Sequence, residues 1–181
     1  MDFEFYILDY IQSNFRTELL DKIMPIVSFM GKLSWIWVVI AIVCLFTKKF
    51  RRLGISLSSD LIFNLIAGNL IIKTIVARPR PCTLNKTVEL ISSVPFDTSF
   101  PSGHTLFAFG AATIIFIYNK WLGIIAYLFA CIMAFSRLYL YVHFPTDILF
   151  GAIFGITFAV ISYFITKPII NPQKLKLVPK Y

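Results

Sequence analysis

Long apolar runs constrain this chain more than any other feature of its sequence. Five stretches approach the ~20 apolar residues that a helix needs to cross the hydrocarbon core of a bilayer. Hydrophobic residues make up 58% of the 181 positions and charged residues only 14%, which is outside the usual balance of a soluble domain. The sequence therefore predicts an all-α, polytopic membrane helix bundle in a single domain, residues 1–181, with about five spans. The predicted spans are residues 33–50, 55–76, 105–118, 121–141 and 145–166.

The first thirty residues differ from the rest of the chain. They carry five of the nine acidic residues together with spaced apolar ones, which predicts an amphipathic helix pair on the membrane surface. The alternative is a re-entrant or sixth spanning helix over 19–30, which would place Asp21, Lys22 and Pro25 in the membrane at a cost. The N-terminus lacks the basic segment and cleavage site of a signal peptide, so we expect no cleavage there.

Basic residues in the short connections predict the orientation. Four lie within 48–52, one is Lys120, and four more lie in the tail, residues 167–181. All of them fall on one side of a five-span bundle, which the positive-inside rule assigns to the cytoplasm. We therefore expect a plasma-membrane protein with a cytoplasmic C-terminus. The net charge of +8 is not arranged as a basic face interleaved with aromatic residues, so we expect no nucleic-acid partner.

Three short polar clusters interrupt the apolar sequence, and together they contain both histidines. They are Lys73-x6-Arg80-Pro81, Pro101-Ser102-Gly103-His104 and Ser136-Arg137-x5-His143-x3-Asp147. The predicted topology places all three at the outer face. The connection 77–101 is the only long loop inside the predicted bundle, and loops of this length are usually functional or disordered. We interpret it as an outer active-site loop.

The clusters contain the residue types that phosphoryl transfer requires. Cations and N–H donors must surround the equatorial oxygens, and Lys73, Arg80 and Arg137 supply the charges. The two arginines can bind phosphate oxygens in a bidentate way. Ser102 and Gly103 precede an apolar helix, whose first N–H groups and dipole attract an anion.

The two histidines have different predicted roles. His104, on the first turn of that helix, lies where it can protonate a leaving oxygen. His143 is the predicted nucleophile, because a bond from its Nδ1–H to Asp147 would leave Nε2 free to attack phosphorus.

In order, spacing and membrane setting, these clusters resemble the phosphatase signature of the type 2 phosphatidic acid phosphatase superfamily, directly over residues 73 to 147. The family usually has six spans, where this sequence predicts five. The resemblance implies a phosphohistidine at one position, acid–base catalysis at another, a phosphate-binding set, and no metal or other cofactor. The residues at the matching positions are His143 and His104 for catalysis, and Lys73, Arg80, Ser102, Gly103 and Arg137 for phosphate binding.

The predicted function is hydrolysis of a lipid phosphate or diphosphate at the outer leaflet. Undecaprenyl diphosphate is the favoured substrate, because the short chain resembles the compact bacterial members of the family. Phosphatidylglycerophosphate, phosphatidate, lipid A phosphates and phosphotransfer to another acceptor are alternatives. A non-catalytic head-group binder or transporter is the alternative from another class. The sequence gives no prediction of the oligomeric state.

Other polar and aromatic residues receive structural interpretations. Arg78 also precedes a proline and competes with Arg80 for the motif, but the family spacing selects Arg80. We therefore expect Arg78 to contact a lipid head group. Asp60, Asn64 and Gly68 recur at intervals of four and indicate interhelical hydrogen bonding and close packing rather than a pathway. The aromatic excess fits interfacial belts, and it includes Trp35, Trp37, Trp121, Tyr139 and Tyr141. Cys44, Cys82 and Cys131 have no disulfide or metal-type spacing and are predicted free thiols.

Overall fold

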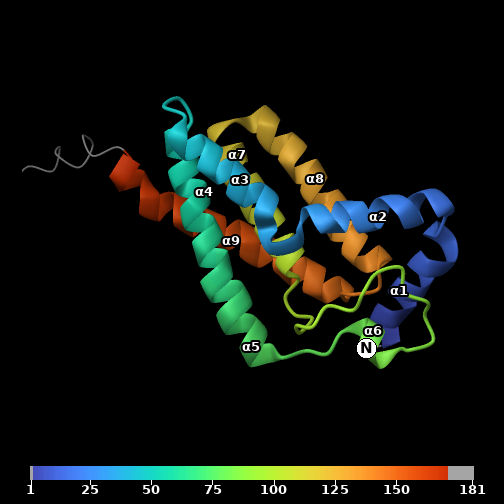
Figure 1. Ribbon diagram of the computed structural model, residues 1–181. Helices are drawn as coiled ribbons and strands as arrows, with labels where there is room; N and C mark the ends of the chain where they lie inside the picture. The colour runs from blue at the N-terminus through green and yellow to red at the C-terminus, as the bar shows by residue number, and fades with distance from the viewer. Residues whose placement is uncertain (1, 171–181) are drawn as a thin grey trace, which may run out of the picture.

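The protein is described here by a computed structural model, over residues 2–170. All regular structure in that part of the chain is helical, and no strand occurs in it (Figure 1). The elements are α1 (Asp2–Phe15), α2 (Glu18–Met30), η1 (Lys32–Ser34), α3 (Trp35–Phe46), α4 (Arg51–Phe63), η2 (Asn64–Ile72), α5 (Lys73–Val76), α6 (Pro81–Leu84), α7 (Gly103–Tyr118), α8 (Lys120–Tyr139) and α9 (Pro145–Ile170). The predicted all-α membrane bundle is thereby confirmed.

The five predicted spans all lie on helices, but not all of those helices are long enough to cross a membrane alone. Three segments pass by length and composition: Arg51–Leu84, Lys120–Tyr139 and Pro145–Ile169. α3 passes only together with α2, across a bend of 46°, and α7 is an apolar helix of 16 residues. The amphipathic surface pair over 1–30 and the re-entrant or spanning helix over 19–30 therefore both stay predictions.

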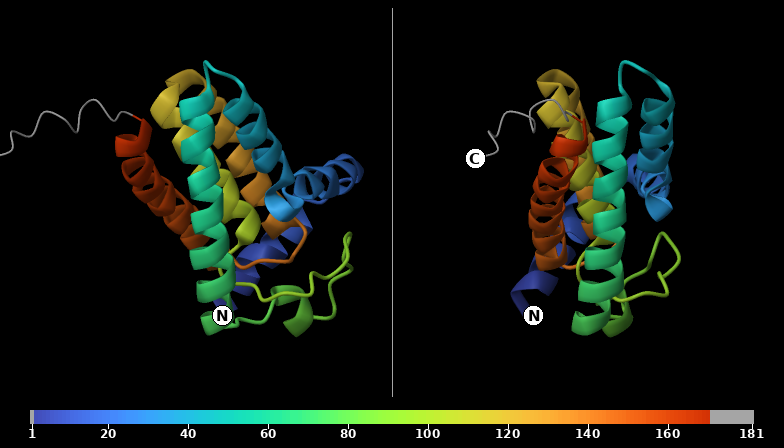
Figure 2. Two further views of the ribbon diagram at one scale, coloured as in Figure 1. Left: turned by 60° about the vertical axis from the view of Figure 1, so that its left-hand side comes forward. Right: turned by 90° about the vertical axis from the view of Figure 1, so that its left-hand side faces the viewer.

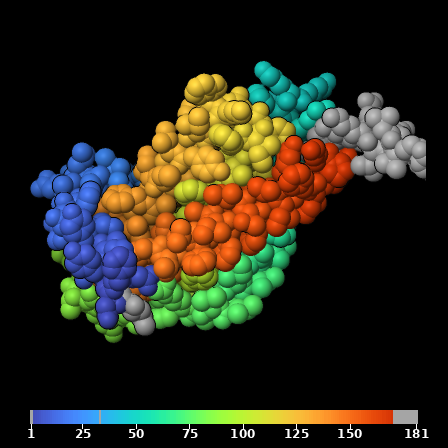
Figure 3. Space-filling model, turned by 180° about the vertical axis from the view of Figure 1, so that it is seen from behind, coloured from blue at the N-terminus to red at the C-terminus, as the bar shows by residue number. Residues whose placement is uncertain are grey.

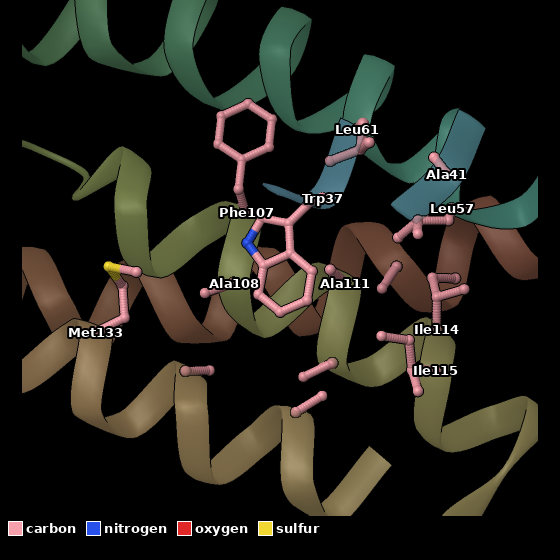
Figure 4. Close-up of a cluster of buried hydrophobic side chains, with 14 residues drawn as sticks. Trp37, Ala41, Leu57, Leu61, Phe107, Ala108, Ala111, Ile114, Ile115 and Met133 are labelled. Carbon is pink, nitrogen blue, oxygen red and sulfur yellow. The ribbon is translucent and has the colours of Figure 1, made fainter. Parts of the chain in front are cut away.

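The core of the bundle lies around α7, which packs against α4, α8 and α9. A cluster of buried side chains joins Trp37 of α3, Leu57 of α4, Ala108 and Ala111 of α7, and Met133 of α8 (Figure 4). Seen from behind, α8 and α9 form one continuous face, with α1 and α2 at one end of it (Figure 3). Trp37 is only 4% exposed, so its assignment to an interfacial belt was wrong.

Small residues allow the helices of the core to approach closely. A Cβ on Gly155 of α9 would lie 2.3 Å from the carbonyl oxygen of Leu106, and a Cβ on Gly68 would lie 2.2 Å from a methyl carbon of the same leucine. Close backbone approach of this kind is a usual basis of helix association in membranes. The close-packing interpretation of Gly68 is confirmed. Asp60 and Asn64, in contrast, bond to each other within their own helix.

Tyrosines near the end of α8 attach the N-terminal helices to the bundle. Tyr139 Oη donates to Asp21 of α2 over 2.5 Å, and Tyr141 Oη donates to Asp9 of α1 over 2.7 Å. Burial and the bond to Asp9 raise the pKa of Tyr141 to about 12, so it remains a donor at neutral pH. Both tyrosines are 1% exposed and do not form an interfacial belt. Asp9 and Asp21 therefore act in docking the first two helices.

A π-helical segment precedes the first polar cluster. Over Asn64–Ile72 the helix is wound in the wider π form, and the N–H of Lys73 donates to the carbonyl of Gly68, five residues back. Such segments are frequent at functional sites, because the added residue changes which face later side chains occupy. Here both Asn69 and Lys73 line the same cavity.

Candidate active site

The three polar clusters meet at one end of the bundle. The turn between α3 and α4 and the junction of α7 and α8 lie at the other end (Figure 2). A cavity of about 770 Å³ opens at the polar end. The predicted site residues that line it are Lys73, Arg80, Gly103, His104, Arg137 and His143.

His143 lies in the short connection between α8 and α9 and is 1% exposed. Arg80 Nη1 donates to its Nε2 over 3.0 Å, so the ring proton of the neutral imidazole is placed on Nδ1. That Nδ1 lies 3.5 Å from Asp147 Oδ2 and 3.4 Å from Ser99 Oγ. Burial, followed by the charges of Arg80, Arg137 and Lys73, holds the pKa of His143 well below its usual range. The imidazole is therefore neutral, and its Nε2 lone pair accepts the hydrogen bond from Arg80 at the edge of the cavity.

Asp147 lies behind His143 in the first turn of α9 and has no exposed surface. Its Oδ2 accepts hydrogen bonds from Ser99 Oγ and from the N–H of Phe144, the latter over 2.8 Å. Its Oδ1 accepts one from Arg78 Nη1, also over 2.8 Å. The carboxylate is thus fixed from several sides, in the place expected for a residue that orients the histidine.

Arg78 connects this carboxylate to the N-terminal helix. Its Nη2 donates to Glu4 Oε2 over 2.6 Å, and Glu4 Oε1 accepts from Thr146 Oγ1 at the same distance. Burial opposes ionisation of Glu4, but the bonds from Thr146 and Arg78 outweigh it and lower the pKa of the carboxyl. The interpretation of Arg78 as a head-group contact was therefore wrong, because its Nη1 and Nη2 both donate to carboxylates of the protein.

Lys73 and Arg80 share one carboxylate, that of Asp97. Lys73 Nζ lies 2.5 Å from Asp97 Oδ2, and Arg80 Nη2 lies 2.5 Å from Asp97 Oδ1. Partial burial alone would raise the pKa of Asp97, but these bonds and charges lower it to about 2. An ionised carboxylate therefore lies between two of the predicted phosphate-binding cations.

Arg137 and His104 both contact Ser28 of α2. Arg137 Nη1 donates to Ser28 Oγ, while His104 Nε2 lies 3.1 Å from the carbonyl oxygen of Ser28 and donates to it. Arg137 is 5% exposed and its Nε has no hydrogen-bond partner among the described residues. A buried donor without an acceptor is costly, and a bound phosphate oxygen would remove this cost.

The second cluster begins α7 as predicted, with Ser102 at the N-cap position. The first helical bond runs from the N–H of Leu106 to the carbonyl of Ser102, which leaves the earlier N–H groups outside the helical ladder. Gly103 lines the cavity at this point. Ser102 is fully buried, its Oγ accepts from Thr105, and it makes no side-chain cap bond. Its predicted phosphate contact stays a prediction.

Apolar side chains continue the cavity away from its charged end. Val38 of α3 lies on one side, and Leu61 and Leu65 of the α4–η2 segment and Phe107 of α7 line the rest. This combination of a cationic end and an apolar wall suits an amphiphile with an anionic head group. Among residues 2–170 no group of three or more His, Cys, Asp or Glu side chains could hold a metal ion.

Sequence reasoning missed several residues of the site. Ser28 and Glu4 reach it from helices far away in the chain, and Asp97 and Ser99 belong to the irregular connection before α7. The sequence carries only weak signals for these residues. Asp97 is an acidic residue close before the second cluster, and Arg78 repeats the Arg-Pro pattern of Arg80.

Residues 37–170 match the PAP2 superfamily, and the chain belongs to this superfamily. The resemblance drawn from the three clusters is thereby confirmed.

Two relatives with assigned names are similar to this chain over most of its length. The chain is 30% identical over 137 residues to the undecaprenyl-diphosphatase of Sulfolobus acidocaldarius, an alignment that covers 75% of this chain and 66% of that protein. It is 29% identical over 140 residues to the lipid A 4'-phosphatase of Bacteroides thetaiotaomicron, covering 71% of this chain and 62% of that protein. The chain thus spans less than two thirds of the length of these curated relatives.

Solved structures show the same fold. LpxE of Aquifex aeolicus superposes with a TM-score of 0.72 at 27% identity, covering 88% of this chain and 94% of that one. A PAP2 type phosphatidylglycerolphosphate phosphatase from Bacillus subtilis superposes with a TM-score of 0.67 at 25% identity, covering 96% of this chain and 86% of that one.

Proposed function

We propose that this protein is a membrane lipid phosphatase that acts through a phosphohistidine on His143 and needs no metal. The observation that carries the proposal is the position of His143. Its Nε2 lies beside Arg80 at a cationic cavity, and its Nδ1 faces Asp147. The named phosphatases among the relatives and neighbours support the same reaction class.

In the first step Arg80 Nη1 transfers its hydrogen bond from His143 Nε2 to a phosphoryl oxygen, and the freed lone pair of Nε2 attacks the terminal phosphorus. A P–N bond forms, the P–O bond to the leaving group breaks, and its electron pair stays on the leaving oxygen. Burial and the charge of Arg137 lower the pKa of His104, the negative charge of the bound phosphate opposes this shift, and the protonated ring gives the leaving oxygen its proton. Asp147 Oδ2, which lies 3.5 Å from Nδ1 and accepts a hydrogen bond from Ser99 Oγ, stabilises the positive charge that develops on the ring. Lys73, Arg80 and Arg137, with the N–H groups at the start of α7, hold the phosphoryl oxygens.

In the second step water hydrolyses the phosphohistidine. Neutral His104 takes a proton from the water as its oxygen attacks phosphorus. The P–N bond breaks, the electron pair returns to His143 Nε2, and inorganic phosphate leaves. His104 is then protonated again and His143 is neutral, so the cycle closes without a further reactant.

The substrate we propose is a lipid phosphate or diphosphate, with undecaprenyl diphosphate as the first choice. The apolar wall of the cavity formed by Val38, Leu61 and Leu65 supports a lipid tail. The relative from Sulfolobus acidocaldarius, named as an undecaprenyl-diphosphatase, favours this head group. The relative from Bacteroides thetaiotaomicron and the neighbour from Bacillus subtilis keep lipid A phosphates and phosphatidylglycerophosphate as alternatives.

We also propose that the site opens on the extracytoplasmic side of the plasma membrane. The basic residues within 48–52 and Lys120 belong to the end of the bundle opposite the site (Figure 2), which supports this orientation under the positive-inside rule. Lysines 174, 176 and 180, which also entered that prediction, lie outside the described residues. Cys82 is buried and is a poor probe of sidedness. Lys86→Cys at the exposed loop, against Lys48→Cys at the other end, is the better labelling pair.

A second candidate is a head-group binder or transporter without phosphatase activity. It is favoured by one relative, named bacitracin transport permease protein BcrC, of Bacillus licheniformis, which is 32% identical over 80 residues, covering 44% of this chain and 37% of that protein. This candidate predicts that loss of His143 leaves lipid binding intact and that the parent protein releases no phosphate.

Phosphate release from a panel of lipids, with and without a chelator, tests the proposal. The panel contains undecaprenyl diphosphate, phosphatidylglycerophosphate, phosphatidate and a lipid A phosphate. We expect release from at least one member, unchanged by the chelator and abolished in His143→Ala. Release that survives in a folded, lipid-binding His143→Ala would contradict the mechanism, and loss of release with the chelator would contradict metal independence.

A further inference from the structure

Asp97 occupies the position where a phosphate would meet the first two cations. Each of its carboxylate oxygens lies 2.5 Å from a different cation, Lys73 Nζ and Arg80 Nη2. Arg80 Nε also donates to the backbone carbonyl of Asp97, over 2.8 Å. A carboxylate bridging two cations in this way uses the same donors that a phosphoryl group would need.

The cations are deeply buried, whereas the carboxylate is not. The side chains of Lys73 and Arg80 are 9% and 3% exposed, and that of Asp97 is 57% exposed. Asp97 ends the segment 92–97, which forms the outer wall of the cavity. The next residues are anchored, because Thr98 Oγ1 donates to the carbonyl of Lys73 and the N–H of Ser99 donates to that of Arg78. The carboxylate can therefore leave while the buried cations and the anchored residues stay in place.

The charge balance of the cavity indicates what can displace it. Lys73, Arg80 and Arg137 contribute three positive charges, and Asp97 offsets one. A ligand with a single negative charge that replaces Asp97 leaves the net charge of the cavity unchanged. A terminal phosphate, with a charge of about −1.5 to −2 at neutral pH, brings more charge than it displaces.

We propose that Asp97 is a specificity-determining residue, an internal carboxylate that the terminal phosphate of the substrate must displace from Lys73 and Arg80. It selects phosphomonoester and diphosphate head groups against the singly charged phosphodiesters of bulk phospholipids, which would otherwise fill the cavity. This inference rests on the proposed function for its biological meaning, but its test is a binding experiment.

The test compares the intact purified protein with Asp97→Asn and Asp97→Ala in detergent. Calorimetric titration with inorganic phosphate measures the multiply charged anion, and titration with phosphatidylglycerol in mixed micelles measures the phosphodiester. Removing one competing charge-assisted contact is expected to tighten phosphate binding about tenfold. The affinity for phosphatidylglycerol is expected to rise by a larger factor than the affinity for phosphate in both neutral variants, because the singly charged phosphodiester is the ligand that Asp97 is proposed to reject.

Glu89→Gln is the matched control, because Glu89 is an exposed carboxylate of the same connection and its loss changes the net charge equally. Asp97→Glu keeps the charge and is expected to bind both probes within about twofold of the parent. Thermal melting confirms that each variant is folded, and either neutral variant alone suffices. The inference is overturned if the folded neutral variants bind either probe no more tightly than the parent, if both probes gain by the same factor, or if Glu89→Gln tightens binding equally.

The two proposals fail separately. If no lipid in the panel releases phosphate, the proposed reaction is wrong, while the titrations still decide whether Asp97 competes with anions. If release occurs and the titrations show no change, the reaction stands and the role of Asp97 is wrong.

Discussion

Arg78 Nη1 donates to Asp147 Oδ1 over 2.8 Å, and this bond leaves Oδ2 of the same carboxylate to face His143. Because Arg78 also holds Glu4 of α1, the orientation of His143, the proposed nucleophile, depends on a helix at the far N-terminus. Arg78 is therefore a positioning residue that acts through Asp147 and does not touch the cavity-lining atoms itself.

Arg78→Gln should reduce turnover more than it reduces substrate binding. Loss of a charge-assisted bond lets the Asp147 carboxylate rotate, and a loss of this kind is worth roughly tenfold or more in kcat. KM should change little, because the phosphate-binding cations are untouched. Steady-state phosphate release measures both constants, and Arg78→Lys should recover part of the loss. Lys86→Gln, at an exposed position of the same connection, is the control. An unchanged kcat in folded Arg78→Gln would show that the bond has no part in positioning.

Glu4→Gln should change how stability depends on acid. The pKa of Glu4 is lowered in the folded protein, so its ion pair stabilises the fold above the unfolded pKa of about 4.3. That stabilisation is lost as the pH falls through the lower, folded pKa. Thermal melts between about pH 7 and about pH 3 should show a shallower acid decline in Glu4→Gln than in the parent. Parallel pH curves for the two proteins would contradict the assigned ion pair.

His143 should remain a neutral imidazole, with its proton on Nδ1, through neutral pH. Its pKa is lowered by burial and by the neighbouring cations, so protonation should occur only below the ordinary value of about 6.5. The chain has two histidines, so 15N-histidine spectra give two imidazoles, and His104→Asn assigns them. A charged His143 at pH 7, or a proton on Nε2, would contradict the hydrogen bond from Arg80.

Gly155→Val should destabilise the bundle. A Cβ at this position would lie 2.3 Å from the Leu106 carbonyl oxygen, so α7 and α9 must separate. Overpacking of this kind costs typically 1–3 kcal/mol. Thermal melting in detergent measures the loss, and Thr157→Ala, at an exposed position of the same helix, is the control. An unchanged melting temperature would mean that the two helices are not packed this closely.

The grouping of the site residues could be predicted because it depends on local spacing. Helix starts and ends bring Lys73, His104 and Asp147 to one end of any bundle of this connectivity, and the structure places them there. The roles of His143 as nucleophile and Asp147 as its orienter, which were argued from their separation of four residues, stay predictions.

The surroundings of the site could not be predicted, because they depend on tertiary contacts between distant segments. Glu4 and Ser28 reach the site because α1 and α2 pack against the end of α8, where Tyr139 and Tyr141 bond to them. Because those tyrosines were assigned to a lipid interface, their bonds to α1 and α2 were not predicted. Asp97 lies in an irregular segment without periodicity, where sequence gives no direction for a side chain.

The most direct test of the central claim is to trap the phosphorylated enzyme. In His104→Asn the first step should still proceed slowly while water is no longer activated, so phosphate from a 32P-labelled lipid diphosphate should accumulate on the protein. Peptide mapping after a rapid quench is expected to place an acid-labile, base-stable phosphate on His143, and no label should appear in His143→Asn. Phosphate release without a trapped intermediate, or label on any other residue, would contradict the account.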